Sequence, residues 1–309
     1  MEINSLIDND FILLDVPQHR NIGDYYILLG ELEYLKKNSH KLIYMSDMFS
    51  FKFEEIKDNI IIILHGGGNF GDLYRKHQEF RLKIIEKYKK NKIIIMPQTV
   101  LYNNESNFIN DINIINGHSR LFAFFRDQNS LLSYNRVSKN EGYLNVDCGE
   151  YFVIKKKYKS SNKNRKILIL DRIDMESKPI DYSNILTGSK VEIRDWPSYG
   201  KSKLENIINI LSDRVLNIVE LAALSRIKNS SKVKKIFYKL YLIKSRYLVD
   251  QRLRFLSNYE IIYTTRLHGM IMGKALKKTI FILDNKYDKC KNYYYTWLIN
   301  EKNISIMKE

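Results

Sequence analysis

The residues best suited to chemistry lie at positions 265–269, which read TRLHG. Arg266 offers a planar cation that matches the geometry of a phosphate or a carboxylate. His268 has an imidazole whose ordinary pKa, about 6.5, lets it give or take a proton at neutral pH. The segment follows a predicted strand and precedes a helix that is expected to begin at Met270, so backbone N–H groups would also favour an anion there. A single histidine in such a place is also commonly a helix cap or a packed core residue, so the segment alone leaves both roles open.

A glycine-rich segment is the second candidate for a binding site. Residues 60–64 are apolar and predict a strand that is buried on both faces, and the sequence HGGGNFGD follows it. Gly67 and Gly68 permit positive φ and let a ligand approach the backbone in the expected loop, while Asn69 adds an amide that can donate and accept. Asp72 is expected to cap the helix that follows or to bind a ligand hydroxyl. An alternative is a tight turn that only packs this helix on the sheet.

Strands and helical stretches alternate along the chain, which predicts the α/β class with doubly wound parallel sheets. We expect strands at residues 11–16, 42–45, 60–64, 93–96, 121–125, 166–170, 191–196, 260–263 and 279–283. Helices are expected at 25–37, 204–211 and 215–227, and a further helix is expected to follow the glycine loop and to end at about residue 90. The carboxyl ends of such strands share one edge, so Asn21, Asp24 and Gln98 should lie near the glycines. Arg126 and Arg172 also follow strands directly, where an arginine is either a ligand-binding cation or a solvated strand end.

A charged stretch without apolar periodicity, residues 155–166, is the best candidate for a linker. It divides the chain into two Rossmann-like domains, residues 1–152 and 153–309, which we expect to face each other across a cleft. Tyr293, Tyr294, Tyr295 and Trp297 predict either a last helix that crosses back to the first domain or an aromatic platform for a sugar.

Composition limits the compartment and the partners. No apolar run approaches the ~18–20 residues that span a bilayer, the acidic N-terminus does not resemble a signal peptide, and Cys148 and Cys290 lack metal-type spacing. We therefore expect a cytoplasmic protein. The net charge of +16 reflects either an anionic partner or codon bias toward lysine, and no nucleic-acid-binding signature accompanies it. Residues 232–247, from Lys232 to Tyr247, predict a basic amphipathic helix that either packs on the second sheet or lies on an anionic membrane.

Taken in order, the segments NIGD, HGGGNFGD, RDQNS, DRID and TRLHG resemble the polysaccharide pyruvyl transferase family, from about Asn21 to Lys289. The resemblance implies two domains arranged as in GT-B glycosyltransferases. It also implies transfer of the enolpyruvyl group of phosphoenolpyruvate to a sugar of a surface-polysaccharide precursor, often lipid-linked, which usually closes a cyclic ketal. No cofactor or metal is expected. A nucleotide-sugar glycosyltransferase and a non-catalytic glycan- or membrane-binding protein are the alternatives.

These expectations assign roles to individual residues. His268 is the predicted general acid, and Asp24 or Asp171 the base. The trianionic donor needs several cations, which are expected to be Arg126, Arg172, Arg266 and Lys289, with Gly269 beside them. The acceptor sugar is assigned to the polar and glycine residues of the first domain: Asn21, Gly67, Gly68, Asn69, Asp72 and Gln98. Asp24 and Asp72 have helix capping as their alternative role.

Overall fold

The computed structural model describes residues 1–19, 21–158, 167–174, 176–183, 185–186, 191–196, 232–283 and 286–307, and only the backbone of 232–237. The chain divides into two compact units, Met1–Lys156 with Lys291–Glu301 (unit 1) and Lys157–Cys290 with Lys302–Glu309 (unit 2). Each unit has its own sheet of parallel strands flanked by helices, so the predicted α/β class is confirmed. The predicted helices at 204–211 and 215–227 and most of the predicted linker lie outside the described residues. A GT-B-like pair of domains facing a cleft stays a prediction.

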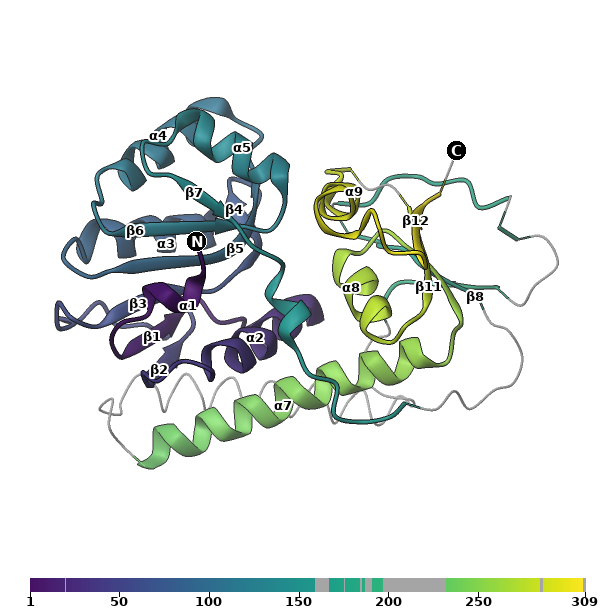
Figure 1. Cartoon of the computed structure of the whole chain (residues 1–309), viewed down its shortest axis with the longest axis horizontal. Helices are drawn as coiled ribbons and strands as arrows, with labels where there is room; N and C mark the ends of the chain where they lie inside the picture. The colour runs from purple at the N-terminus through teal and green to yellow at the C-terminus, as the bar shows by residue number, and fades with distance from the viewer. Residues whose placement is uncertain are drawn as a thin grey trace. The chain divides into compact units, whose positions relative to one another are not determined.

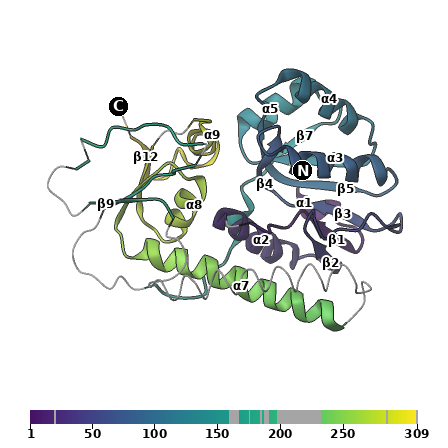
Figure 2. The ribbon, with the colours of Figure 1, turned by 180° about the vertical axis from the view of Figure 1, so that it is seen from behind.

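The sheet of unit 1 has the strand order β2–β1–β3–β5–β6–β7 (Figures 1 and 2). Its strands are β1 (Phe11–Leu14), β2 (Leu42–Ser46), β3 (Ile61–Leu64), β5 (Ile93–Leu101), β6 (Leu121–Phe125) and β7 (Gly142–Leu144), and its helices are α1 (Ile3–Leu6), α2 (Ile22–Leu35), α3 (Arg75–Lys87), α4 (Glu105–Asn116), α5 (Gln128–Val137) and the 3₁₀ turn η1 (Cys148–Tyr151). From β1 the chain passes through α2 to its neighbour β2 on one side, and from β3 it passes through α3, α4 and α5 to β5, β6 and β7 on the other side. Right-handed crossovers therefore place α2 on the opposite face from α3–α5. Every residue of β1 and β3 is buried, as strands covered on both faces should be.

The loops at the carboxyl edge of this sheet are shaped by polar residues. Asp15 adopts a positive φ of 63°, and β1 ends just before it at Leu14, two residues before the predicted strand end at position 16. Asn21 caps α2, because its side-chain oxygen accepts a hydrogen bond from the Gly23 amide at 3.1 Å. The cap starts α2 three residues earlier than the apolar pattern indicates. Asp24 consequently lies in the first turn of the helix.

The glycine-rich segment is a strand, which corrects the predicted loop. Gly67–Gly71 forms β4, which pairs in parallel with the second half of β5. Gly67 and Gly71 have positive φ values of 125° and 148°, and a Cβ on Gly71 would lie only 1.7 Å from the Leu101 carbonyl oxygen. Glycine thus permits an approach to β5 that any side chain would block. The extra partner explains why β5 continues to Leu101 rather than ending at Met96.

The sheet of unit 2 has the strand order β12–β11–β10–β8–β9, and all pairs are parallel. Its strands are β8 (Ile167–Leu170), β9 (Val191–Arg194), β10 (Ile261–Thr264), β11 (Thr279–Ile282) and β12 (Ile304–Ile306), and its helices are α7 (Lys232–Ser257) and α8 (Leu267–Ala275). Helix α8 starts three residues before the predicted position, directly after Arg266. Both members of the pair His268 and Gly269 therefore belong to its first turn.

The last part of the chain is shared between the units. α9 (Lys289–Tyr293) begins in unit 2, and residues Lys291–Glu301, which include the π-helical turn η2 (Tyr294–Leu298), group with unit 1. The Trp297 indole donates to the Arg126 carbonyl at 2.8 Å, and the Tyr293 hydroxyl donates to Glu150 at 3.2 Å. Side-chain hydrogen bonds therefore tie this segment to the unit 1 sheet. No helix of the described residues is both long and apolar enough to cross a membrane.

Candidate functional site

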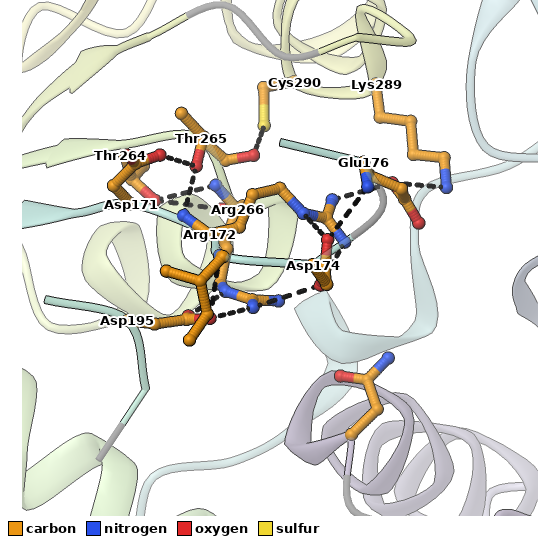
Figure 3. A network of polar contacts seen from close by, with 12 residues as sticks. Asp171, Arg172, Asp174, Glu176, Asp195, Thr264, Thr265, Arg266, Lys289 and Cys290 are labelled. Atoms are coloured by element: carbon orange, nitrogen blue, oxygen red, sulfur yellow. Dashed lines mark hydrogen bonds and ion pairs between the residues drawn. The ribbon is translucent and has the colours of Figure 1, made fainter. Parts of the chain in front are cut away.

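Three cations belong to one connected polar network in unit 2 (Figure 3). Arg172 follows β8, Arg266 follows β10, and Lys289 begins α9. Because β8 and β10 are neighbouring parallel strands, residues just beyond their carboxyl ends lie close together. The structure thus brings together three of the four cations that the sequence analysis assigns to the donor.

Each of these cations is held by carboxylates. Arg172 donates to both oxygens of Asp174 at 2.8 and 2.9 Å and to Glu176 at 2.7 Å. Lys289 donates to the same Glu176 oxygen at 2.9 Å. Arg266 pairs with Asp195 through two nitrogens, one of them at 2.5 Å. The cations are therefore oriented before any ligand arrives, but their charges are already balanced.

Asp174 lies between the two guanidinium groups (Figure 3), since it also accepts from Arg266 at 3.3 Å. Burial raises the pKa of Asp174, but hydrogen bonds and charge from Arg172, together with the charge of Arg266, outweigh burial and hold that pKa below its ordinary value. Counting Asp171, four carboxylates accompany three cations in the described part of the network. An anionic ligand would have to replace some of these carboxylates.

His268 and Gly269 lie in the first turn of α8, beside this network. No side chain caps the helix at Arg266, so backbone N–H groups of the first turn are not covered by a capping side chain there. His268 is half-buried. A Cβ on Gly269 would lie 2.6 Å from a methyl group of Leu170 and 2.8 Å from the Thr264 hydroxyl. Gly269 therefore lets the start of α8 pack directly on β8 and β10. This packing is what the structure shows of Gly269, and its place beside the donor stays a prediction.

Asp171, the alternative predicted base, is engaged within unit 2. Its oxygens accept from the Thr265 hydroxyl at 3.1 Å and from the Tyr182 hydroxyl in a short hydrogen bond. Burial and this carboxylate raise the pKa of Tyr182, so the phenol remains a donor. These contacts favour a structural role for Asp171 at the end of β8.

Arg126 lies in unit 1 and is buried. Its guanidinium donates to Asp147 and to the Thr99 hydroxyl, both at 2.7 Å, and its side chain is 3% exposed. Thr99 in turn donates to Asp127 at 3.1 Å. This network fixes the ends of β5 and β6, and it favours a structural role over donor binding for Arg126.

A second polar group lies at the carboxyl edge of the unit 1 sheet. Asp24 contacts His19 at 3.2 Å and accepts from the Asn21 amide at 3.0 Å. A Cβ on Gly67 would lie 3.6 Å from an Asp24 oxygen, so the glycine strand and Asp24 are neighbours. The structure thus brings Asn21 and Gly67, both assigned to the acceptor, close to Asp24, the predicted base.

Buried side chains fix the strand-to-strand connection that precedes β4. Glu31 of α2 contacts the His65 ring nitrogen Nδ1 at 2.6 Å and accepts from the Gly66 amide at 2.8 Å. Gln98 is fully buried, donates to the His65 carbonyl at 2.7 Å and accepts from the Asn69 amide N–H at 3.4 Å. The Gln98 side chain therefore positions the glycine segment, instead of lying open to a sugar.

Asp72 does not cap a helix, which corrects that expectation. α3 begins at Arg75 after Tyr74, without a side-chain cap. Asp72 accepts instead from the backbone amides of Asn103 and Asn104 at 2.7 and 2.9 Å. It thus joins the end of β4 to the loop before α4.

Several charged residues of unit 1 that lie at or near this edge were not predicted from the sequence. An Asp15 carboxylate oxygen accepts from the His77 ring nitrogen Nδ1 at 2.8 Å, and the His77 and His19 rings meet edge to face at 6.0 Å. The signal for Asp15 was its position directly after an apolar run, but the expected strand included it. Glu31 and Arg81 gave no signal, because charged residues on amphipathic helices are ordinarily exposed.

Among the described residues, no group of three or more His, Cys, Asp or Glu side chains is arranged to hold a metal ion. Cys148 and Cys290 are buried free thiols.

A model of the polysaccharide pyruvyl transferase family matches residues 21–287. The chain belongs to the polysaccharide pyruvyl transferase family. The family name describes a transferase that moves a pyruvyl group to a polysaccharide, and the resemblance seen in the sequence is confirmed. All five sequence segments that carried the resemblance lie inside the match.

Two relatives align along most of this pyruvyl transferase family member. The EpsO protein of Bacillus subtilis (strain 168), whose name provisionally calls it a pyruvyl transferase, is 29% identical over 94% of this chain and 86% of its own length. Pyruvyl transferase 1 of Schizosaccharomyces pombe is 23% identical over 93% of this chain and 69% of its own length. A crystal structure of an uncharacterized protein from Klebsiella pneumoniae is similar in fold, with a TM-score of 0.63 at 20% identity over 99% of this chain and 96% of that one.

Proposed function

We propose that this protein transfers the enolpyruvyl carbons of phosphoenolpyruvate to a sugar of a polysaccharide precursor, closing a cyclic ketal and releasing phosphate. Membership of the family supports pyruvyl transfer to a polysaccharide. The observation that carries the choice of donor is the joint network of Arg172, Arg266 and Lys289 beside the start of α8. A donor with a phosphate and a carboxylate needs such a group of cations.

The proposed reaction balances with the residues at hand. His268 gives a proton to the methylene carbon of phosphoenolpyruvate, which makes C2 electrophilic, and a sugar hydroxyl adds to C2 as its proton passes to Asp24. The bond between C2 and the phosphate oxygen then breaks, and a second hydroxyl closes the ketal. The two hydroxyl protons replace the proton added to carbon and the proton that leaves with phosphate.

The ion pairs of unit 2 define how the donor would bind. Asp174 and Glu176 occupy the positions on Arg172 that a phosphate or carboxylate would take. Donor binding is then an exchange of anions, in which the oxygens of phosphoenolpyruvate replace carboxylate oxygens without a large movement of the arginines. The cations stay oriented in both states, which lowers the cost of assembling them.

The acceptor is proposed to be a lipid-linked sugar, bound by the unit 1 residues around Asp24 and Asn69. Surface-polysaccharide precursors are assembled on lipid carriers, and the basic residues of α7 would suit an anionic membrane surface. The side chains of 232–237 lie outside the described residues, and α7 exposes Leu240, Ile243 and Tyr247 beyond them. The protein would then work in the cytoplasm, at the inner face of the membrane.

The test is phosphate release from phosphoenolpyruvate with a panel of nitrophenyl and lipid-linked sugars. We expect release that depends on one of the sugars, and a loss of roughly 100-fold or more in kcat for His268→Gln, the range for a missing general acid. His40→Gln is the matched control and should retain activity. Release of a nucleotide from nucleotide sugars, with none of phosphate from phosphoenolpyruvate, would show a glycosyltransferase and overturn the proposal.

A further inference from the structure

Arg81 is a fully buried arginine of α3 that has no carboxylate partner in the described part of the chain. Its exposed fraction is 1%, and its hydrogen bonds among the described residues go to neutral groups. One guanidinium nitrogen donates to the Gln78 side-chain oxygen, and another donates to the Asn69 side-chain oxygen at 2.7 Å. The guanidinium also lies 5.1 Å from the centre of the Phe70 ring. A buried cation held only by neutral groups costs free energy, so its position calls for an explanation.

The orientation of Asn69 follows from this contact. A guanidinium can only donate hydrogen bonds, so the oxygen of the Asn69 amide must face Arg81. The NH₂ group of the same amide must then point away from Arg81. That group has no hydrogen-bond partner among the described residues, and the Asn69 side chain is half-buried at the glycine strand β4. Asn69 therefore presents a fixed hydrogen-bond donor.

A chain of hydrogen bonds that leads from Asp111 to Arg81 imposes the same orientation on these side chains. The Gln78 side-chain oxygen accepts from Arg81, and its NH₂ group donates to the Tyr102 hydroxyl at 3.0 Å. Tyr102 donates to Asp111 at 2.8 Å, and Arg75 donates to the same Asp111 oxygen at 2.7 Å. Since Asp111 accepts from both, every group in the chain has one possible orientation.

We propose that Arg81 is a positioning residue that makes the Asn69 amide a dedicated donor to an oxygen atom of the acceptor sugar. The proposal deepens the proposed function, because it rests on the acceptor binding beside β4. Asn69 lies two residues from Gly67, which neighbours Asp24. A donor at this position would hold a ring, ether or hydroxyl oxygen while a second hydroxyl faces Asp24.

The decisive variant is Asn69→Asp, which keeps the shape and replaces the donor by a second acceptor. A carboxylate facing Arg81 forms an ion pair with a cation that is already buried, so the Tm should equal or exceed that of the wild type. The KM for the nitrophenyl sugar that supports phosphate release should rise roughly 10-fold, as expected for a lost hydrogen bond and a new repulsion. The KM for phosphoenolpyruvate should stay within about twofold, because Asn69 belongs to unit 1 and the proposed donor cations to unit 2.

Three further variants separate positioning from simple destabilisation. Asn113→Asp makes the same change on an exposed position of α4 and should alter neither KM. Tyr102→Phe removes the hydrogen bond from Tyr102 to Asp111 but leaves Arg81 in contact with Asn69. The sugar KM should therefore change less than threefold. Arg81→Met removes the constraint, and it should raise the sugar KM as Asn69→Asp does.

The outcomes distinguish this inference from the proposed function. An unchanged sugar KM in Asn69→Asp, or a fall in its Tm below that of Asn113→Asp, would overturn the role of Arg81. If the wild type releases no phosphate with any sugar, the proposed function fails. The Tm comparison then still tests the contact: a raised Tm supports the orientation of Asn69, and a lowered Tm refutes it.

Discussion

Arg81 of unit 1 and the two arginines of the unit 2 network have opposite kinds of hydrogen-bond partner. In unit 1, the hydrogen-bond partners of Arg81 among the described residues are neutral, whereas in unit 2 Arg172 and Arg266 each contact two carboxylates. Neutral partners fix the direction of an arginine and leave its charge uncompensated at short range. Carboxylate partners fix the direction and also supply anions that a ligand can replace. The difference suits a positioning role in unit 1 and an anion-binding role in unit 2.

Removal of a unit 2 arginine should have the largest effect. In Arg266→Met the donor loses a charged partner, and Asp195 and Asp174 lose one of their cations. We expect the Kd for phosphoenolpyruvate, measured by calorimetry, to rise roughly 100-fold, within the range for truncating one member of a buried charge pair. Arg254→Met, which removes an exposed arginine paired with Asp250, should leave the Kd unchanged. Equal values for both variants would end the assignment of Arg266 to the donor.

Removal of a competing carboxylate should have a smaller effect of opposite sign. Asp174→Asn keeps a hydrogen-bond acceptor between Arg172 and Arg266 but removes the negative charge that the donor must replace. We expect the Kd for phosphoenolpyruvate to fall about 5-fold, a change of about 1 kcal/mol. Asp181→Asn, at an exposed carboxylate that accepts from Ser183, serves as the control. A Kd that rises in Asp174→Asn would show that this carboxylate orients the arginines and does not compete with the donor.

The smallest effect concerns His65, a buried imidazole of unit 1 whose partner is the Glu31 carboxylate. Burial alone lowers the pKa of His65, but the charge and hydrogen bond of Glu31, with the charges of Asp24 and Asp15, outweigh burial and raise that pKa. The raised pKa means that protonated His65 stabilises the folded protein. This contribution is fully present at pH values below the unfolded pKa of about 6.5, and it is lost as the pH rises through the folded pKa.

The Tm of the wild type should therefore exceed that of His65→Gln most at pH 5.5–6. This difference in Tm should shrink by a few degrees toward pH 9, since a loss of about 1 kcal/mol lowers the Tm by ~2–4 °C. Differential scanning fluorimetry across this pH range measures the shift. His40→Gln should follow the wild type at each pH. A constant difference across the range would show that the pair of His65 and Glu31 does not carry a titrating charge.

The sequence predicts the elements whose pattern is local. Strand β6 was expected at 121–125 and has these bounds, and β3 and β8 differ by one residue at their starts. The class with parallel sheets follows from the alternation of strands and helices. The glycine strand β4 could not be predicted in this way, because β4 exists through pairing with β5, and glycine has a low strand propensity of its own.

The candidate site was predictable in residue type but not in charge balance. The positions of Arg172, Arg266 and Lys289 after strands or at a helix start gave a direct signal for one shared edge. Their carboxylate partners gave none: Asp195 lies 71 positions from Arg266 in sequence, and only the fold brings them together. Arg81 was missed for a related reason, since its burial depends on how α3 packs on β4.

The assignment of residues 291–301 to unit 1 also has a consequence for how the chain is made. The Arg126 carbonyl and Glu150 receive hydrogen bonds from Trp297 and Tyr293, which the ribosome adds 171 and 143 residues later. Unit 1 therefore cannot reach its final form as its own first 156 residues emerge, and it must wait, incomplete, until residue 301 has left the exit tunnel.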